Sequence, residues 1–299
     1  MSTRAGNPVL VTGASGQLGS RVVQLLIGHG IPVIAATRNP AKIAELGAEV
    51  RVADFDQSPD ELAKAFGGAS RMLLISTDAV DRPGHRYEQH QRAIEAAVKA
   101  GVEHIVYTSL THPAEDSPVL IAPDHFQTEK ALEASGLGYT ALRNNLYTDL
   151  LLMSLPAAIA SGRLFAAAGD GGAAYVTRED CARAAAMALT SNFDGKRQIE
   201  ITGPSVVTYA ELAEHASELT GKQVVYVPID EEALIAGMVE SGLPEPVARL
   251  MASFDTALKR GLLGPATNEA ENLTGSVPTS VRAFLEANRA ALSRSGPNN

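Results

Sequence analysis

The order of apolar and polar positions predicts strands and helices that alternate along the first half of the chain. Short apolar and β-branched runs, bounded by glycine, proline or polar residues, indicate buried strands, and longer segments with helical spacing lie between them. We expect strands at 9–12, 32–37, 49–54, 71–76, 104–109 and 138–143, and helices at 20–27, 58–66, 83–100 and 124–135. This alternation predicts an α/β fold, a Rossmann-type doubly wound parallel sheet.

The regular alternation weakens beyond residue 144. There we expect helices at 149–161, from 177, from 208, within 230–258 and at 278–291, a glycine-rich loop at 166–174 and a strand at 198–202. We therefore divide the chain into a Rossmann domain, 1–148, and a smaller, mainly helical C-terminal lid, 149–299, some of whose elements return to the main sheet. A ligand crevice is expected between the two parts.

Three glycines at a spacing of three residues separate the first predicted strand from the first predicted helix. Gly13 allows a tight turn, Gly16 lets the backbone approach a pyrophosphate, and Gly19 lets the helix pack on the strand. The free N–H groups at the start of the helix then face the anion. We predict an NAD(P)-binding cradle that also includes Ser15, Gln17 and Leu18; an ordinary strand-to-helix turn is the alternative.

The end of the second predicted strand indicates which cofactor is used. NAD-binding sheets carry a carboxylate at this point for the ribose 2′-hydroxyl, but this chain has Arg38. An arginine suits a 2′-phosphate through charge-assisted hydrogen bonds. We therefore predict NADP(H), with NAD(H) as the alternative if Arg38 is only a solvated loop residue.

Composition excludes several classes of function. The net charge is −9 with no cluster of lysine and arginine, which argues against nucleic acid as a partner. No run of about 18 apolar residues occurs, so we expect a soluble, cytoplasmic protein with no membrane partner. One cysteine, Cys181, and histidines without metal-binding spacing predict no metal site. A homodimer stays open.

Several motifs in combination resemble one protein family. The resemblance rests on residues 12–19, 37–40, 73–76, 107–109, 125–130, 135–137, 139–140, 142–144 and 168–171. Together they resemble the NmrA-like atypical short-chain dehydrogenase/reductases, and within them the bacterial NAD(P)H:quinone oxidoreductases of type 2, with triphenylmethane reductases as near relatives. The resemblance implies a flavin-free oxidoreductase that passes hydride from NADPH to a quinone or a similar planar conjugated acceptor.

Further cofactor contacts are expected along the carboxyl ends of the strands. The resemblance implies that an acid and an apolar residue, Asp54 and Phe55, contact the adenine. The ends of the fourth and fifth strands face the ligand crevice of such a sheet. We therefore add Ser76, Thr77, Thr108 and Ser109 to the predicted cofactor site.

The catalytic residues depart from the common pattern of short-chain dehydrogenases. In the alignment that the resemblance implies, the positions of the usual tyrosine and lysine hold Ile121 and His125. His125 is predicted as a proton donor or cofactor-ribose contact, and a packed histidine is the alternative. Tyr147 and Asn144 follow the sixth strand, where Tyr147 either stacks on a planar acceptor or packs the lid.

Two other functions stay open at this stage. The first is an NADP(H)-sensing regulator of the NmrA-like type that binds the cofactor without turnover, which the missing tyrosine and lysine favour. The second is a reductase of triarylmethane dyes. Steady oxidation of NADPH by a quinone separates the sensor from the enzymes.

Overall fold

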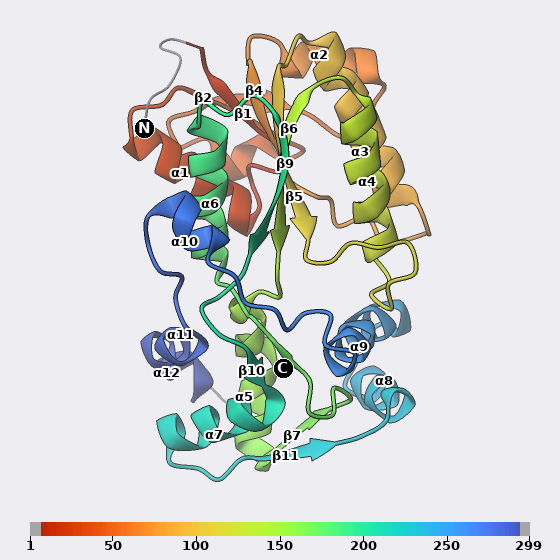
Figure 1. The fold of residues 1–299 in the computed structure, drawn as a ribbon, viewed down its shortest axis with the longest axis vertical. Coiled ribbons are helices and arrows are strands. Elements are labelled where there is room, and N and C mark those ends of the chain that lie inside the picture. Colours follow the sequence, from red (N-terminus) through yellow and green to blue (C-terminus); the bar gives the residue numbers. More distant parts are fainter. Residues whose placement is uncertain (1–6, 294–299) are drawn as a thin grey trace.

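The main body of the protein is a seven-stranded parallel sheet covered by helices on both faces (Figure 1). The computed structural model describes residues 7–293. The sheet order is β3-β2-β1-β4-β5-β6-β9, so the order reverses between β1 and β4. Its strands are β1 (Val9–Val11), β2 (Val33–Thr37), β3 (Glu49–Val52), β4 (Arg71–Leu74), β5 (His104–Leu110), β6 (Gly138–Asn144) and β9 (Lys196–Ile201). This is the predicted doubly wound sheet, which is confirmed with an additional seventh strand.

Helices from both halves of the chain cover the sheet. The helices α1 (Gln17–Gly28) and α6 (Arg178–Thr190) lie on one face, and α2 (Pro59–Phe66), α3 (His85–Lys99) and α4 (Ala122–Ala134) lie on the other (Figure 1). The capping box that opens α2 forms, since the Ser58 hydroxyl accepts from the Glu61 N–H and the Glu61 carboxylate accepts from the Ser58 N–H.

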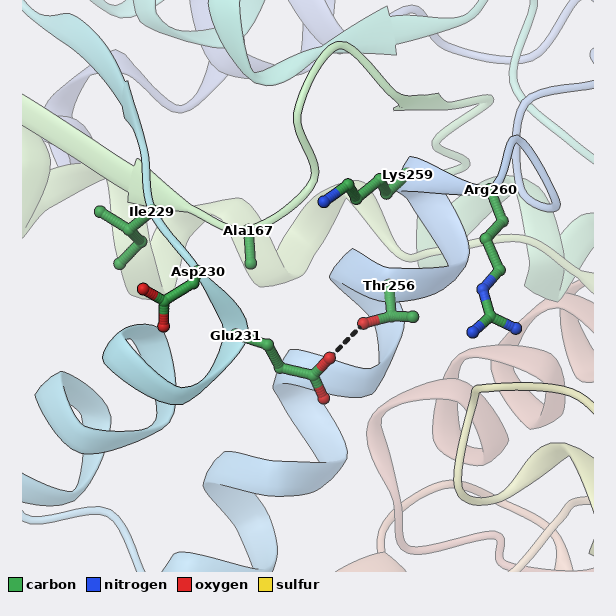
Figure 2. Close-up of a pocket in the computed structure, with 7 residues that line it drawn as sticks. All are labelled: Ala167, Ile229, Asp230, Glu231, Thr256, Lys259 and Arg260. Carbon is green, nitrogen blue, oxygen red and sulfur yellow. Dashed lines mark hydrogen bonds between the residues drawn. The ribbon is translucent and has the colours of Figure 1, made fainter.

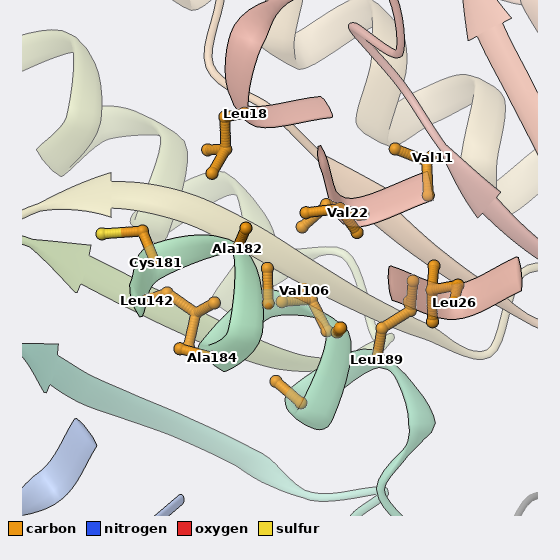
Figure 3. Close-up of a cluster of buried hydrophobic side chains, with 14 of the residues drawn as sticks. Val11, Leu18, Val22, Leu26, Val106, Leu142, Cys181, Ala182, Ala184 and Leu189 are labelled. Atoms are coloured by element: carbon orange, nitrogen blue, oxygen red, sulfur yellow. The ribbon is translucent and has the colours of Figure 1, made fainter. Parts of the chain in front are cut away.

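The packing of α1 against α6 shows that part of the C-terminal half belongs to the main body. Val22 and Leu26 of α1 meet Ala182 and Leu189 of α6 over the sheet (Figure 3). Alanines are abundant along α6, so the two helix backbones approach closely. The lone cysteine, Cys181, is buried in this cluster, and burial raises the pKa of its thiol well above the usual value.

The remaining elements form a second lobe below the carboxyl edge of the sheet (Figure 1). It has two small sheets, β7–β11 and β8–β10, and its own buried apolar cluster. The elements are η2 (Thr148–Leu150), α5 (Leu151–Ser161), β7 (Arg163–Ala166), β8 (Gly172–Ala173), β10 (Val207–Thr208), α7 (Tyr209–Thr220), β11 (Val225–Pro228), α8 (Glu231–Glu240), α9 (Glu245–Lys259), α11 (Val281–Ala287) and α12 (Arg289–Leu292), while α10 (Glu269–Thr274) lies beside α6.

Several boundaries differ from the sequence-based expectation. The first helix begins at Gln17 rather than at residue 20, because the third glycine lies inside its first turn. The predicted glycine-rich loop contains β8, and β7 and β11 were not predicted. The last helix is broken at Asn288 into α11 and α12. Within residues 7–293, every helix is too short or too polar to span a bilayer.

Candidate functional site

A cleft of about 350 Å³ lies at the carboxyl edge of the sheet, where the strand order reverses. In doubly wound sheets this crevice is the place where ligands bind. Residues from the loops after β1, β2, β3 and β4 form its walls, together with one residue of β2 and one of α3. They are Gly13, Ser15, Gly16, Thr37, Arg38, Lys42, Ala53, Asp54, Phe55, Ile75, Ser76, Thr77, Asp78 and Gln89.

The glycines shape the floor of the cleft as a dinucleotide requires. Gly13 has a φ of +59°, which side-chain-bearing residues rarely adopt. A Cβ on Gly19 would lie 2.3 Å from the Gly13 carbonyl oxygen, so only glycine lets α1 start so close to β1. Gly16 is the N-cap of α1 and supplies no side-chain cap, which leaves the first N–H groups of the helix available to an anion. The cradle fits a pyrophosphate.

Two cations stand on the β2 side of the cleft. The side chain of Arg38 is 62 % exposed, and its nearest acidic partner is Asp78, with 3.5 Å between Nη2 and Oδ1. Lys42 lies one turn further on, in the short helix η1 (Pro40–Ile43), and also lines the cleft. Below them the Thr37 hydroxyl donates to Ser15 Oγ at 2.7 Å and fixes the loop that carries Arg38. These groups suit a phosphate beside the ribose.

The loop after β4 is held from below by buried hydrogen bonds. The Ser76 N–H donates to Thr108 Oγ1 at 2.8 Å, and the Thr77 N–H donates to His90 Nε2 at 3.0 Å. Because His90 accepts through Nε2, its proton lies on Nδ1 and points to Thr128 Oγ1, 2.9 Å away. Burial lowers the pKa of His90 to about 3, so the ring is neutral. The loop that borders the cleft is therefore fixed to both α3 and α4.

His125 lies in the same buried region, against β5. Its Nδ1 is 2.7 Å from the hydroxyl of Tyr107, and the residue is 3 % exposed. Burial lowers the pKa of His125 well below its usual value and raises the pKa of Tyr107. The neutral imidazole and the phenol form a hydrogen-bonded pair beneath the cleft, so the predicted role of His125 as a donor stays a prediction.

Ser109, at the end of β5, joins a second buried network. Its hydroxyl donates to Glu129 Oε1 at 2.7 Å, and Arg143 makes bonds of 3.0 and 2.7 Å to the two oxygens of the same carboxylate. Arg143 also reaches Glu200 of β9 at 3.4 Å, so this network ties β5, β6, β9 and α4 together. The Ser109 hydroxyl therefore donates its hydrogen bond within the protein, and its predicted contact with the cofactor stays a prediction.

Asn144 and Tyr147 lie at the end of β6, as predicted, and touch each other. Asn144 Nδ2 donates to the Tyr147 hydroxyl at 3.3 Å, while Asn144 Oδ1 is buried without a hydrogen-bond partner among residues 7–293. The Arg178 guanidinium lies 5.0 Å above the Tyr147 ring. Burial raises the pKa of Tyr147, so its phenol keeps its proton.

A larger hollow of about 500 Å³ lies in the second lobe (Figure 2). Acidic and basic side chains share its wall, with Asp230 and Glu231 on one side and Lys259 and Arg260 on the other (Figure 2). The Thr256 hydroxyl donates to Glu231 at 2.6 Å across it. Mixed charges and the absence of a glycine cradle in its lining make it unsuited to a dinucleotide.

The structure brings most of the predicted cofactor residues together. Eight of them line the cleft, namely Gly13, Ser15, Gly16, Arg38, Asp54, Phe55, Ser76 and Thr77. Gln17, Leu18 and Gly19 form the first turn of α1 beneath it, and Thr108 supports Ser76. Lys42, Asp78 and Gln89 were not among the predicted site residues. Of these three, Lys42 could have been found from the sequence, because it is a second basic residue one turn after Arg38.

Comparison with known proteins identifies the family. The protein-family model described as NAD(P)H-binding matches residues 13–192, which contain every residue that lines the cleft. The chain belongs to this NAD(P)H-binding family. It is 38 % identical to quinone oxidoreductase 2 of Escherichia coli over 91 % of this chain and 96 % of that protein.

Solved structures agree with this assignment. An NADPH-dependent quinone oxidoreductase from Escherichia coli, complexed with NADPH, superposes with a TM-score of 0.88 at 37 % identity, over 94 % of this chain and 99 % of that one. The triphenylmethane reductase of Citrobacter sp., complexed with NADP(H), gives 0.85 at 36 % identity over 94 % and 99 %. The resemblance predicted from the motifs is confirmed.

Proposed function

We propose that the protein is an NADPH-dependent oxidoreductase that passes hydride directly, without flavin, to a quinone or a similar planar conjugated acceptor. One observation carries the proposal: Arg38 and Lys42 line the same cleft as the glycine cradle. Two cations beside a dinucleotide site favour a cofactor with an additional phosphate. The similarity to an enzyme named quinone oxidoreductase supports the choice of acceptor.

In this proposal the residues of the cleft bind and orient the cofactor. The first turn of α1 receives the pyrophosphate, Arg38 and Lys42 hold the 2′-phosphate, and Asp54 and Phe55 border the adenine. The bound NADPH supplies the hydride. Asn144 and Tyr147 lie at the end of β6, where Asn144 holds the Tyr147 hydroxyl and the Tyr147 ring is placed to border a planar acceptor.

The buried state of His125 favours an acceptor that needs little help from an acid. Reduction of a ketone gives a strongly basic alkoxide, which requires a donor. Hydride addition to a quinone instead gives an aromatic hydroquinone anion of low basicity, which solvent protonates. A neutral imidazole in contact with Tyr107 is compatible with the second reaction. We propose His125 as a support of the site rather than as an indispensable acid.

A dye reductase is the second candidate, favoured by the 36 % identity to triphenylmethane reductase. Both activities are tested by following NADPH absorbance with a panel of neutral quinones and triarylmethane dyes. The proposal expects the highest kcat/KM with quinones and a preference for NADPH over NADH. A preference for the dyes would favour the dye reductase, and binding of NADPH without turnover would favour the sensor. Whether the chain is a homodimer is measured by light scattering on the same preparation.

A further inference from the structure

Arg86 is a buried cation without a counter-ion in the part of the chain that the structure describes. Its side chain lies in the first turn of α3, and the residue is 7 % exposed. Its Nε is fully buried and has no hydrogen-bond partner. Asp78 and Asp124 act on it only as charges at a distance, and no ion pair forms within residues 7–293. A guanidinium in this state is costly unless something else compensates its charge.

The surroundings of Arg86 place no carboxylate of the described residues in contact with it, since Asp124 and Asp78 favour its charge only from a distance. It lies near the N-terminus of α3, where the helix dipole disfavours a cation, and the N-cap residue, Gly84, brings no side-chain oxygen. His90, His125 and Tyr107 are close enough to interact with Arg86 electrostatically, and the two histidines are neutral. An arginine kept here for stability alone would be expected to have a carboxylate against it.

Two further buried polar atoms without partners among the described residues lie close by, one in the loop after β4 and one on α3. Thr77 Oγ1, after β4, and Gln89 Oε1, one turn beyond Arg86, are buried and make no hydrogen bond to any residue that the structure describes. Thr77 and Gln89 both line the cleft. A loop and a helix that border a cleft and leave three polar atoms unsatisfied are prepared for a polar ligand.

We propose that Arg86 is the cation of the acceptor site, where its guanidinium receives an acceptor oxygen that carries or gains negative charge. This inference rests on the proposed function. The cofactor phosphates are served on the β1–β2 side by the first turn of α1, Arg38 and Lys42. Arg86 interacts electrostatically with Tyr107 of β5 and Asp124 of α4, and more weakly with Asp78 in the loop after β4. Two of these three groups lie over the half of the sheet where the nicotinamide and the acceptor belong.

The charge balance of the reaction explains why a cation is useful there. The C–H bond of the dihydronicotinamide breaks, and its hydrogen and electron pair pass to the quinone. The cofactor is oxidised by two electrons, and the quinone becomes a hydroquinone monoanion, which then takes one proton from solvent. A fixed guanidinium stabilises that oxyanion as it forms without having to transfer a proton.

The test compares the parent with Arg86→Gln. With neutral naphthoquinone, kcat/KM should fall on the order of ten- to a hundredfold, as for the loss of one charged hydrogen bond. Naphthalenesulfonate, an anionic probe, should bind the NADP⁺-loaded variant more weakly on a similar scale in a calorimetric titration, while the Kd of NADPH stays unchanged. The Tm should be equal to or above that of the parent, because an unpaired buried charge is gone.

Matched variants make the outcome decisive. Lys99→Gln removes a cation from the exposed end of the same helix, where it pairs with Asp60 and Glu95, and should leave kcat/KM, sulfonate binding and the Kd of NADPH unchanged. Arg86→Lys keeps the charge and should recover part of the activity.

Unchanged kinetics and sulfonate binding in the folded Arg86→Gln protein would overturn the inference, and so would a parallel loss of NADPH affinity, which would assign Arg86 to the pyrophosphate. If the parent oxidised no NADPH with any quinone, the proposed function would fail. The sulfonate titration alone would then decide the role of Arg86: weaker binding by the variant would support it, and equal binding would overturn it.

Discussion

Replacing Arg38 by glutamine should weaken binding of NADPH far more than binding of NADH. The side chain of Arg38 is 62 % exposed, and its contact with Asp78 is long, at 3.5 Å, and solvated. Such a pair contributes little, so the guanidinium is available to a phosphate. Loss of a charged hydrogen bond costs about 1.5–3 kcal/mol, which is roughly a 10- to 150-fold increase in Kd.

Lys42 limits the size of this effect. Because it lines the same wall, NADPH should still bind to Arg38→Gln, and Lys42→Gln should show a smaller loss with the same selectivity. Asp78→Asn should tighten NADPH, since it removes a negative charge beside the expected phosphate and frees the guanidinium. The three variants therefore predict changes of different size and sign from one arrangement of charges.

Calorimetric titration of each protein with both cofactors is the appropriate assay, because it measures affinity without turnover. Arg249→Gln is the control; it removes an exposed arginine that pairs with Glu245 and Glu232 in the second lobe. Equal losses of NADPH and NADH affinity in Arg38→Gln would refute the assignment of the 2′-phosphate to this wall.

Three further predictions test other parts of the site. Gly16→Val should abolish NADPH binding, measured by calorimetry, and leave the protein folded. Gly28→Ala is the control and should bind normally, because nothing lies within 4 Å of the added Cβ. Near-parental affinity in Gly16→Val would mean that the glycines only make a turn. Burial lowers the pKa of His90 from 6.5 to about 3, so between these pH values the unfolded chain binds a proton that the folded protein excludes. The free energy of unfolding should therefore fall as the pH drops from 6.5 to about 3, by up to about 1.4 kcal/mol per pH unit. Urea unfolding at several pH values should show a shallower dependence for His90→Gln, and identical slopes would contradict the buried neutral ring. The purified protein should be colourless, and deuterium at the transferred position of NADPH should pass to the hydroquinone or to solvent; a tightly bound flavin seen by absorbance would disprove direct transfer.

The parts of the fold that local sequence determines could be predicted. Strand, glycines and helix stand together at residues 9–28, and the capping boxes at Ser58 and Thr208 formed where their residues predicted them. The strand β9 was recognisable, but its pairing with β6 depends on contacts between segments 57 residues apart, as in Arg143↔Glu200. The strand β7 was not predicted because its four residues follow a helix directly and alternate only twice between exposed and buried positions.

The same distinction applies to the site. Residues that follow a strand, such as Arg38 and Ser76, were placed correctly because the carboxyl edge of the sheet is implied by the alternation. Arg86 and His90 lie on one helix and His125 on another, with Tyr107 on a strand between them. Their meeting depends on how α3 and α4 pack on β5, which no local pattern specifies.

The groups beneath the cleft indicate the kind of acceptor that this site suits. Burial lowers the pKa of His125 and raises the pKa of Tyr147, so both side chains are neutral near pH 7. In the alignment that the resemblance implies, the position of the usual catalytic tyrosine holds Ile121, which is the N-cap residue of α4. Arg86 interacts electrostatically with Tyr107 and His125 and has no counter-ion among the described residues. A site with a fixed cation and without a group poised to give up a proton stabilises negative charge but does not neutralise it. It therefore suits acceptors whose reduced form is a stable anion, as a hydroquinone is, and disfavours simple ketones, whose alkoxides demand an acid.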